Sequence, residues 1–140
     1  MFYFYLLLTV IFWGSAPIFD KYVLSKGLSP LIVTTVRSIV LALMLGAAVA
    51  VSGRYEGLRQ LNWKLLSLIA ISGLLGGGLG QLTYYMALKS ERAALVVPLA
   101  AAYPVVTMLL GISFLGEALT LWRTVGVLLV LAGAILVKVG

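Results

Sequence analysis

Few side chains in this sequence are able to do chemistry, and most of them lie inside long apolar runs. Arg37 is the one charged residue well inside such a run, six residues past its start at Leu31. Thr34 and Ser38 flank it at helical spacing. Near the centre of a bilayer a guanidinium costs at least ~2.5 kcal/mol. Two interpretations stay open: Arg37 extends to the headgroups, or it attracts an anionic or zwitterionic group in a cavity.

Other polar or amphipathic residues lie at similar depth. Gln81 with Tyr84 or Tyr85 falls on neighbouring faces of one helix, and Tyr103 with Thr107 does so on the next. Such residues supply the few directional contacts of an apolar binding pocket, or they form hydrogen bonds between helices. The predicted lining of a substrate cavity is Trp13, Ser15, Arg37, Gln81, Tyr84 and Tyr103.

The sequence contains few of the residue types that form catalytic or metal sites. The chain has no cysteine, no histidine and only four acidic residues, so thiol, imidazole and metal sites are hard to assemble. We therefore predict no enzyme activity, no metal site and no cofactor. Glu117 is expected to pair with Arg123 across a short turn, or to carry a proton. The first apolar run has no carboxylate deep in the membrane, which argues against proton-coupled export of hydrophobic cations.

The elements that position these residues are predicted to be membrane-spanning helices. Of the 140 residues, 63% are hydrophobic and 10% are charged, whereas soluble domains have about 25% charged residues. A helix needs about 20 apolar residues to cross a bilayer. Continuous apolar runs favour helices over the alternating strands of a barrel. The sequence predicts an all-α bundle of five transmembrane helices in one domain, at residues 2–19, 31–52, 65–88, 93–115 and 121–137.

The net charge of +6 comes from basic residues scattered singly between the runs, which is typical of headgroup contacts and not of nucleic-acid binding. The N-terminal face holds Arg54, Arg59, Lys64 and Arg123, and the other face holds Lys21, Lys26, Lys89, Arg92 and Lys138. Adding Arg37 to its nearer face gives six against four. Since cytoplasmic loops normally have a clear excess of basic residues, this chain has either one weakly biased orientation or both orientations.

Glycines and prolines interrupt the predicted spans. Glycines recur at four-residue spacing in the third span, as Gly73/Gly77 and Gly76/Gly80, a pattern typical of close helix packing. Their low helix propensity also allows a flexible point near Gly77. Prolines remove backbone hydrogen bonds and kink helices, either statically or as hinges. The predicted hinge or kink positions are Pro17, Gly77, Pro98 and Pro104.

Several segments resemble EamA-type domains of the drug/metabolite transporter superfamily. The resemblance is carried by residues 84–89 (YYMALK), 97–99 (VPL), 103–105 (YPV) and 114–120 (FLGEALT), with 13–19 (WGSAPIF), Lys21 and the pair Arg37 and Ser38. It implies one half of a ten-helix transporter built as an inverted repeat, completed by a second, inverted copy. Residues 126–134 are similar to the glycine-spaced dimer motif of small multidrug resistance relatives, which implies dimer contacts at Gly126 and Gly133. The membrane-embedded glutamate of those relatives is absent.

The expected function is transport of small solutes, as an exporter in the plasma or inner membrane. The expected partners are the lipid bilayer, a small-molecule substrate and an inverted second copy, which would together give alternating access. The alternative is a non-transporting membrane subunit that pairs with and stabilises another membrane protein.

Overall fold

The computed structural model describes all 140 residues, and its regular elements are all helices, with no strand. Five helical stretches are long and apolar enough to cross a membrane, which confirms the predicted all-α membrane bundle. These stretches are Phe2–Ser25, Pro30–Ser52, Trp63–Ser90, Ala93–Leu115 and Leu121–Val139.

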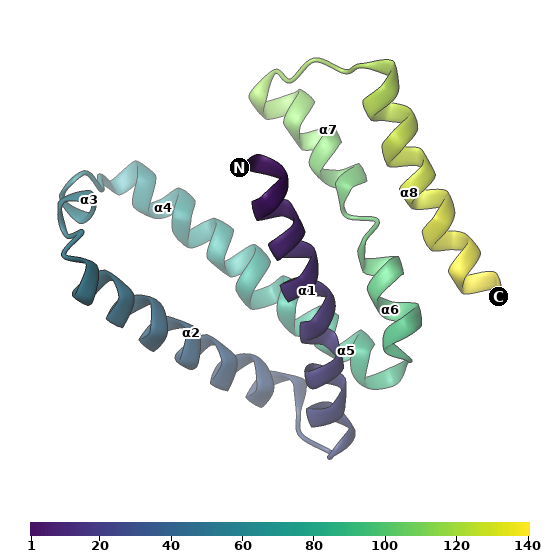
Figure 1. Cartoon of the computed structure of the whole chain (residues 1–140), viewed down its shortest axis with the longest axis horizontal. Coiled ribbons are helices and arrows are strands. Elements are labelled where there is room, and N and C mark those ends of the chain that lie inside the picture. The colour runs from purple at the N-terminus through teal and green to yellow at the C-terminus, as the bar shows by residue number, and fades with distance from the viewer. The chain divides into compact units, whose positions relative to one another are not determined.

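The chain divides into two compact units, Met1–Ser90 and Glu91–Gly140, which are described separately (Figure 1). The first unit contains α1 (Phe2–Ser25), α2 (Pro30–Ser52), the short α3 (Glu56–Arg59), α4 (Trp63–Ser72), the π-helix η1 (Gly73–Gly80) and α5 (Gln81–Ser90). The second unit contains α6 (Ala93–Ala100), α7 (Pro104–Leu115) and α8 (Leu121–Val139).

Helix α1 continues six residues beyond the predicted end of the first span, so that Asp20 and Lys21 are helical residues and not part of a connection. It ends where Gly27 adopts a φ of 93°, in the region that favours glycine. Helix α2 starts three residues later, at Pro30, with the Ser29 hydroxyl accepting a hydrogen bond from the amide of Ile32. This tight turn brings the end of α1 next to the start of α2.

The third span runs through α4, η1 and α5 without a break. It begins at a capped end, where the side-chain oxygen of Asn62 accepts a hydrogen bond of 2.9 Å from the Leu65 amide. The glycine-rich segment Gly73–Gly80 then takes the wider π-helical form. π-Helical turns are rare. Five of the eight residues here are glycine, which has a low α-helix propensity, so the change from α-helix to π-helix costs less in this segment.

The fourth span is discontinuous. Helix α6 ends at Ala100, residues 101–103 form a turn, and α7 begins at Pro104. Proline is well suited to the first position of a helix because its missing N–H has no partner there in any case. Pro104 therefore starts a new helix, whereas Pro98 lies inside α6. Within this unit α8 packs against both α6 and α7.

Candidate functional site

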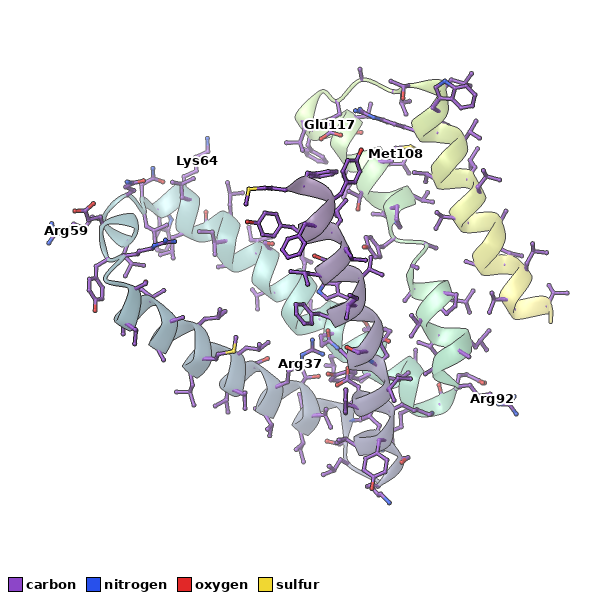
Figure 2. All side chains as sticks on the ribbon, viewed as in Figure 1. Arg37, Arg59, Lys64, Arg92, Met108 and Glu117 are labelled. Atoms are coloured by element: carbon purple, nitrogen blue, oxygen red, sulfur yellow. The ribbon has the colours of Figure 1, made fainter.

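Three polar side chains meet in the first unit, each from one of three helices that are long and apolar enough to cross a membrane. The Tyr85 hydroxyl of α5 donates a hydrogen bond of 2.8 Å to Oδ1 of Asp20 in α1. The same hydroxyl accepts a bond of 2.7 Å from Nη1 of Arg37 in α2. Nη1 also lies 3.4 Å from Oδ2 of Asp20, as an ion pair. Figure 2 labels Arg37 among the side chains of this unit. We call these three residues the polar cluster.

Each helix places its member of the polar cluster on its packed face. On α1, Asp20 lies between buried Pro17 and Leu24, three and four residues away. On α5, Tyr85 is fully buried and lies three residues before buried Leu88. These spacings put the residues on one stripe of each helix.

Helix α2 follows the same pattern, since buried Thr34 precedes Arg37 by three residues. Helices α1, α2 and α5 pack against one another in pairs. Their packed faces therefore meet at the polar cluster.

Two lysines form hydrogen bonds to backbone carbonyls near the helix ends beside the polar cluster. Nζ of Lys21 donates a hydrogen bond of 2.7 Å to the carbonyl oxygen of Leu88, near the end of α5. Nζ of Lys89 donates one of 3.2 Å to the carbonyl oxygen of Leu28, in the turn between α1 and α2. Cations are favourable at helix C-termini because the last carbonyls carry partial negative charge. The ends of α1 and α5 and the start of α2 are thus joined by backbone contacts as well as by the polar cluster.

The polar cluster is electrically neutral as a whole, but only one nitrogen of the guanidinium takes part in its hydrogen bonds. The Asp20 side chain is 16% exposed and the Arg37 side chain 39% exposed. Arg37 makes both of its contacts through Nη1, so Nε and Nη2 have no protein partner. Guanidinium binds carboxylate and phosphate best through two parallel N–H groups. The free edge of Arg37 is therefore able to bind an anion.

The other predicted cavity residues of the first unit lie apart from this network of hydrogen bonds. Trp13 is 68% exposed, and the Ser15 hydroxyl bonds to the carbonyl of Phe12, one turn back in α1. Gln81 and Tyr84 are half-buried in α5, where the Tyr84 ring lies beside that of Tyr85. Among the predicted residues of this unit, Arg37 alone bonds to a side chain of another helix.

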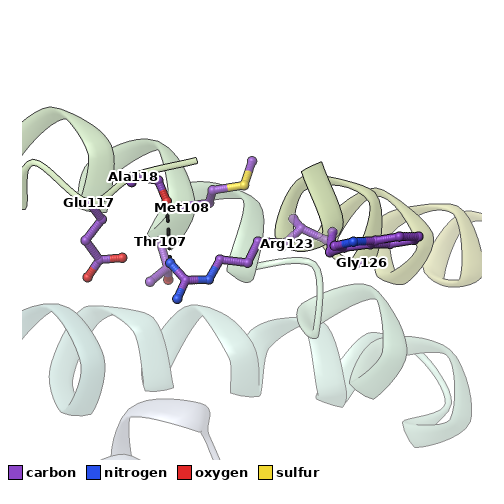
Figure 3. A pocket seen from close by; sticks show the side chains of 8 residues that line it. Thr107, Met108, Glu117, Ala118, Arg123 and Gly126 are labelled. Carbon is purple, nitrogen blue, oxygen red and sulfur yellow. Dashed lines mark hydrogen bonds between the residues drawn. The ribbon is translucent and has the colours of Figure 1, made fainter. Parts of the chain in front are cut away.

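In the second unit, Tyr103 directly precedes α7, makes no capping hydrogen bond through its side chain and is 58% exposed. An open hollow of about 740 Å³ lies between α7 and α8 (Figure 3). At its edge, Arg123 donates a hydrogen bond of 3.4 Å to the Ala118 carbonyl oxygen. The Glu117 carboxylate lies instead beside Gly111. The hollow is lined by Thr107, Met108, Glu117, Ala118, Trp122, Arg123, Gly126 and Val127.

The predicted hinge and dimer positions differ in their surroundings. Pro17 is buried within α1, whereas Gly77, Gly126 and Gly133 have open space where a side chain would project. No atom within 4 Å would contact a Cβ added at these three glycines. Their surfaces are free to contact lipid or another chain.

Asp20 and Tyr85 are the site residues that sequence reasoning missed. Asp20 follows the end of the continuous apolar run and so reads as a loop residue, although apolar Tyr22, Val23 and Leu24 continue the helix. The sequence does not separate Tyr85 from its neighbour Tyr84, and the structure places the Tyr85 hydroxyl in the polar cluster. The helical spacing of Gln81, Tyr85 and Leu88 was the available signal. No group of three or more histidine, cysteine, aspartate or glutamate side chains is positioned to hold a metal ion.

Comparison with known proteins assigns the family. The EamA-like transporter family matches residues 1–139, which is nearly the whole chain and spans both compact units. The chain belongs to the EamA-like transporter family. It is a multi-pass membrane protein of a transporter family, and the resemblance drawn from the sequence motifs is thereby confirmed.

Two relatives of this EamA-like chain match most of its length. An uncharacterized protein of Methanocaldococcus jannaschii is 34% identical over 134 residues, covering 95% of this chain and 93% of the relative. An uncharacterized transporter in the cobO 3′ region of a Sinorhizobium species is 35% identical over 106 residues, covering 76% of this chain and 74% of the relative. No solved structure matches this chain.

Proposed function

We propose that this chain exports small solutes across the plasma or inner membrane, working as an antiparallel homodimer by alternating access. The observation that carries the proposal is the polar cluster of Asp20, Arg37 and Tyr85, held between three spans of an EamA-like chain. Charged residues inside membrane spans are expensive and mark solute or ion pathways. Transport gives this arrangement a use that packing alone does not.

The exposure of the predicted cavity residues supports a second copy. Trp13 is exposed on α1, and every residue of α2 from Ser38 to Ser52 is exposed. Inverted-repeat transporters bind their solutes near the midplane, between two halves of opposite orientation. We propose that the second half is an inverted copy of this chain and that the cavity lies between the copies. Its lining would be Trp13, Ser15, Arg37, Gln81, Tyr84 and Tyr103.

The interrupted helices supply the proposed movement. The third span contains the π-helical segment around Gly77, and the fourth contains Pro98 and the turn before Pro104. Broken or irregular helices at membrane depth are typical of transporters that rock around a central site. We propose that these positions, together with Pro17, absorb the backbone changes between inward-open and outward-open states.

The test is solute flux in proteoliposomes of the purified full chain, over a panel of amino acids, organic acids and organic cations. We expect at least one solute to cross faster than in protein-free liposomes, and Arg37→Gln to slow it at least tenfold. Trp122→Phe, at the start of α8, is the matched control and is expected to keep the parent rate. Flux equal to that of empty liposomes for every solute would contradict transport.

Orientation and partnership need separate measurements. Two C-terminal reporters, one active only in the cytoplasm and one only outside, are both expected to be active if the chain inserts both ways. Activity of one reporter alone would contradict the antiparallel homodimer. Native purification separates the alternative function, because a stoichiometric foreign partner without self-association would identify a non-transporting subunit.

A further inference from the structure

The ion pair in the polar cluster is weaker in geometry than the hydrogen bonds around it. The Tyr85 hydroxyl contacts Arg37 at 2.7 Å and Asp20 at 2.8 Å, whereas Arg37 and Asp20 approach each other only to 3.4 Å, through a single guanidinium nitrogen. A carboxylate paired with arginine frequently accepts two parallel N–H bonds from it. Asp20 thus neutralises Arg37 without occupying its two-pronged edge.

We propose that Arg37 and Asp20 form a joint binding site for an organic carboxylate and one proton; this deepens the transport function proposed above and rests on it. In the empty carrier Asp20 neutralises Arg37. When a solute arrives, its carboxylate binds Nε and Nη2 of Arg37, so that one guanidinium then faces two carboxylates, the solute's and that of Asp20. A proton from the aqueous side of entry then binds Oδ2 of Asp20, while Tyr85 continues to donate to Oδ1.

Charge balance explains why the anion and the proton would bind together. The empty cluster has one positive and one negative charge, so it is neutral. A bound carboxylate alone gives it a net charge of −1, which is unfavourable inside a membrane span. Adding a proton to Asp20 restores neutrality. The two neutral forms are the empty one and the doubly loaded one, so transport is expected to couple one proton to each carboxylate.

Asp20 and Arg37 both lie within helices that are long and apolar enough to cross a membrane, and neither is at a helix end. Asp20 precedes the end of α1 by five residues, and Arg37 follows the start of α2 by seven, which corresponds to about 8 Å and about 10 Å along the helices. The cluster is also sheltered, since Tyr85 is fully buried and the Asp20 side chain is 16% exposed.

The titratable and charged groups that face Asp20 come from all three helices of the cluster. Helix α2 contributes Arg37, and α5 contributes Tyr85 and Tyr84, which both interact electrostatically with the carboxylate. On α1 the neighbouring Lys21 reaches the Leu88 carbonyl. Arginine remains charged and tyrosine remains neutral near pH 7. Asp20 is the member of the cluster that changes charge when Arg37 is taken by another anion.

The test is binding to the purified full chain in an uncharged maltoside detergent, which has no phosphate group. The probes are acetate, lactate, benzoate and hexanoate, each compared with its uncharged amide. Binding is measured as a shift of the unfolding temperature between pH 5.5 and pH 8. We expect at least one carboxylate, and not its amide, to bind more tightly as the pH falls, approaching about tenfold per pH unit because one proton is linked to binding.

Variants separate the two partners. Asp20→Asn imitates the protonated residue, so it is expected to bind the carboxylate tightly at every pH. Arg37→Lys keeps the charge but loses the two-pronged edge, so binding should weaken about tenfold or more. Glu56→Gln, at an exposed carboxylate of the short α3 outside the spans, is the control and should keep the pH dependence of the parent.

A measurement on the parent protein does not depend on variants that fold. In weakly buffered solution with a pH-indicating dye, the protein is expected to take up one proton for each carboxylate that it binds. No preference for carboxylates over amides, binding without proton uptake, or an Asp20→Asn variant with the parent pH dependence would each overturn the proposal. If only a short-chain phosphatidylglycerol shows pH-linked binding, the ligand is a lipid headgroup and the proposal is also wrong.

Failure here is distinguishable from failure of transport. Flux in liposomes that does not depend on pH would leave the transport function standing and remove the coupled site. Proton-linked carboxylate binding without flux of any solute would support the coupled site and contradict the transport function.

Discussion

The hydroxyl of Tyr85 lies 2.8 Å from Oδ1 of Asp20, a residue 65 positions earlier in the chain, and it also accepts a hydrogen bond from Arg37. This one oxygen joins α1, α2 and α5. The direct contact between the two charged groups is longer, at 3.4 Å. Tyrosine is therefore the centre of the cluster, and the two charges are held in place through it.

Removal of this hydroxyl is expected to destabilise the first unit. Tyr85→Phe removes one hydrogen bond from each of two charged groups, Arg37 and Asp20, and hydrogen bonds to charged groups are worth about 1.5–3 kcal/mol. We expect a loss of about that size in the free energy of unfolding, measured by denaturant titration in detergent. Tyr84→Phe is the matched control because the Tyr84 hydroxyl makes no hydrogen bond in the structure. Equal effects of the two substitutions would show that the cluster does not form.

The charge pair predicts a coupling that a double-mutant cycle can measure. Arg37→Gln leaves the Asp20 carboxylate without its cation, and Asp20→Asn leaves the guanidinium without its anion. We expect the two single substitutions to lower the free energy of unfolding by a larger sum than the double substitution does. The difference is the interaction energy, expected to be about 0.5–3 kcal/mol. Unfolding midpoints of the four proteins give this number. Additive effects, as expected for Asp20→Asn combined with Arg123→Gln, would mean that the two charges are independent.

The sequence predicts the fold of this chain better than its site. Apolar runs of about 20 residues allow few structures in lipid, because every backbone polar group must be paired within the span. Length and composition alone therefore indicated five helices. The end of α1 was less predictable, since a charged residue after an apolar run normally marks the membrane surface. Asp20 departs from that rule because its charge is neutralised by a residue 17 positions later.

The choice between neighbouring tyrosines shows the same limit. Tyr84 and Tyr85 are adjacent in the sequence and point about 100° apart on a helix, so the sequence alone does not say which of them faces α1 and α2. Packing decides it: Tyr85 is fully buried and Tyr84 is half-buried. Pairings between distant segments depend on how the helices rotate against one another, and that rotation is set by the whole unit.

The π-helical segment predicts a position-specific effect of alanine. A Cβ added at Gly80 would lie 2.5 Å from the Leu75 carbonyl oxygen, whereas one added at Gly76 or Gly77 would have no neighbour within 4 Å. We expect Gly80→Ala to destabilise by about 1–3 kcal/mol through this overlap. Gly76→Ala is the control and is expected to be neutral or stabilising by up to about 1 kcal/mol, since alanine favours helices. Thermal unfolding in detergent compares them, and equal behaviour would mean that this segment is not π-helical.

The open glycines of α8 predict where the second copy binds. Gly126 and Gly133 are seven residues apart and so share a helix face, and neither would contact another atom of the chain through a Cβ. Leucine at either position therefore fits the single copy but keeps another helix from approaching closely. Small residues let two helix backbones approach closely, and this packing favours helix association in membranes. We expect Gly126→Leu and Gly133→Leu to weaken self-association roughly tenfold, measured by energy transfer between labelled copies in liposomes, without lowering the unfolding temperature. Gly57→Leu places the same side chain at an open glycine of the short α3, between two spans, and should leave association unchanged. If it weakens association as much as the α8 variants do, the contact is not made through α8.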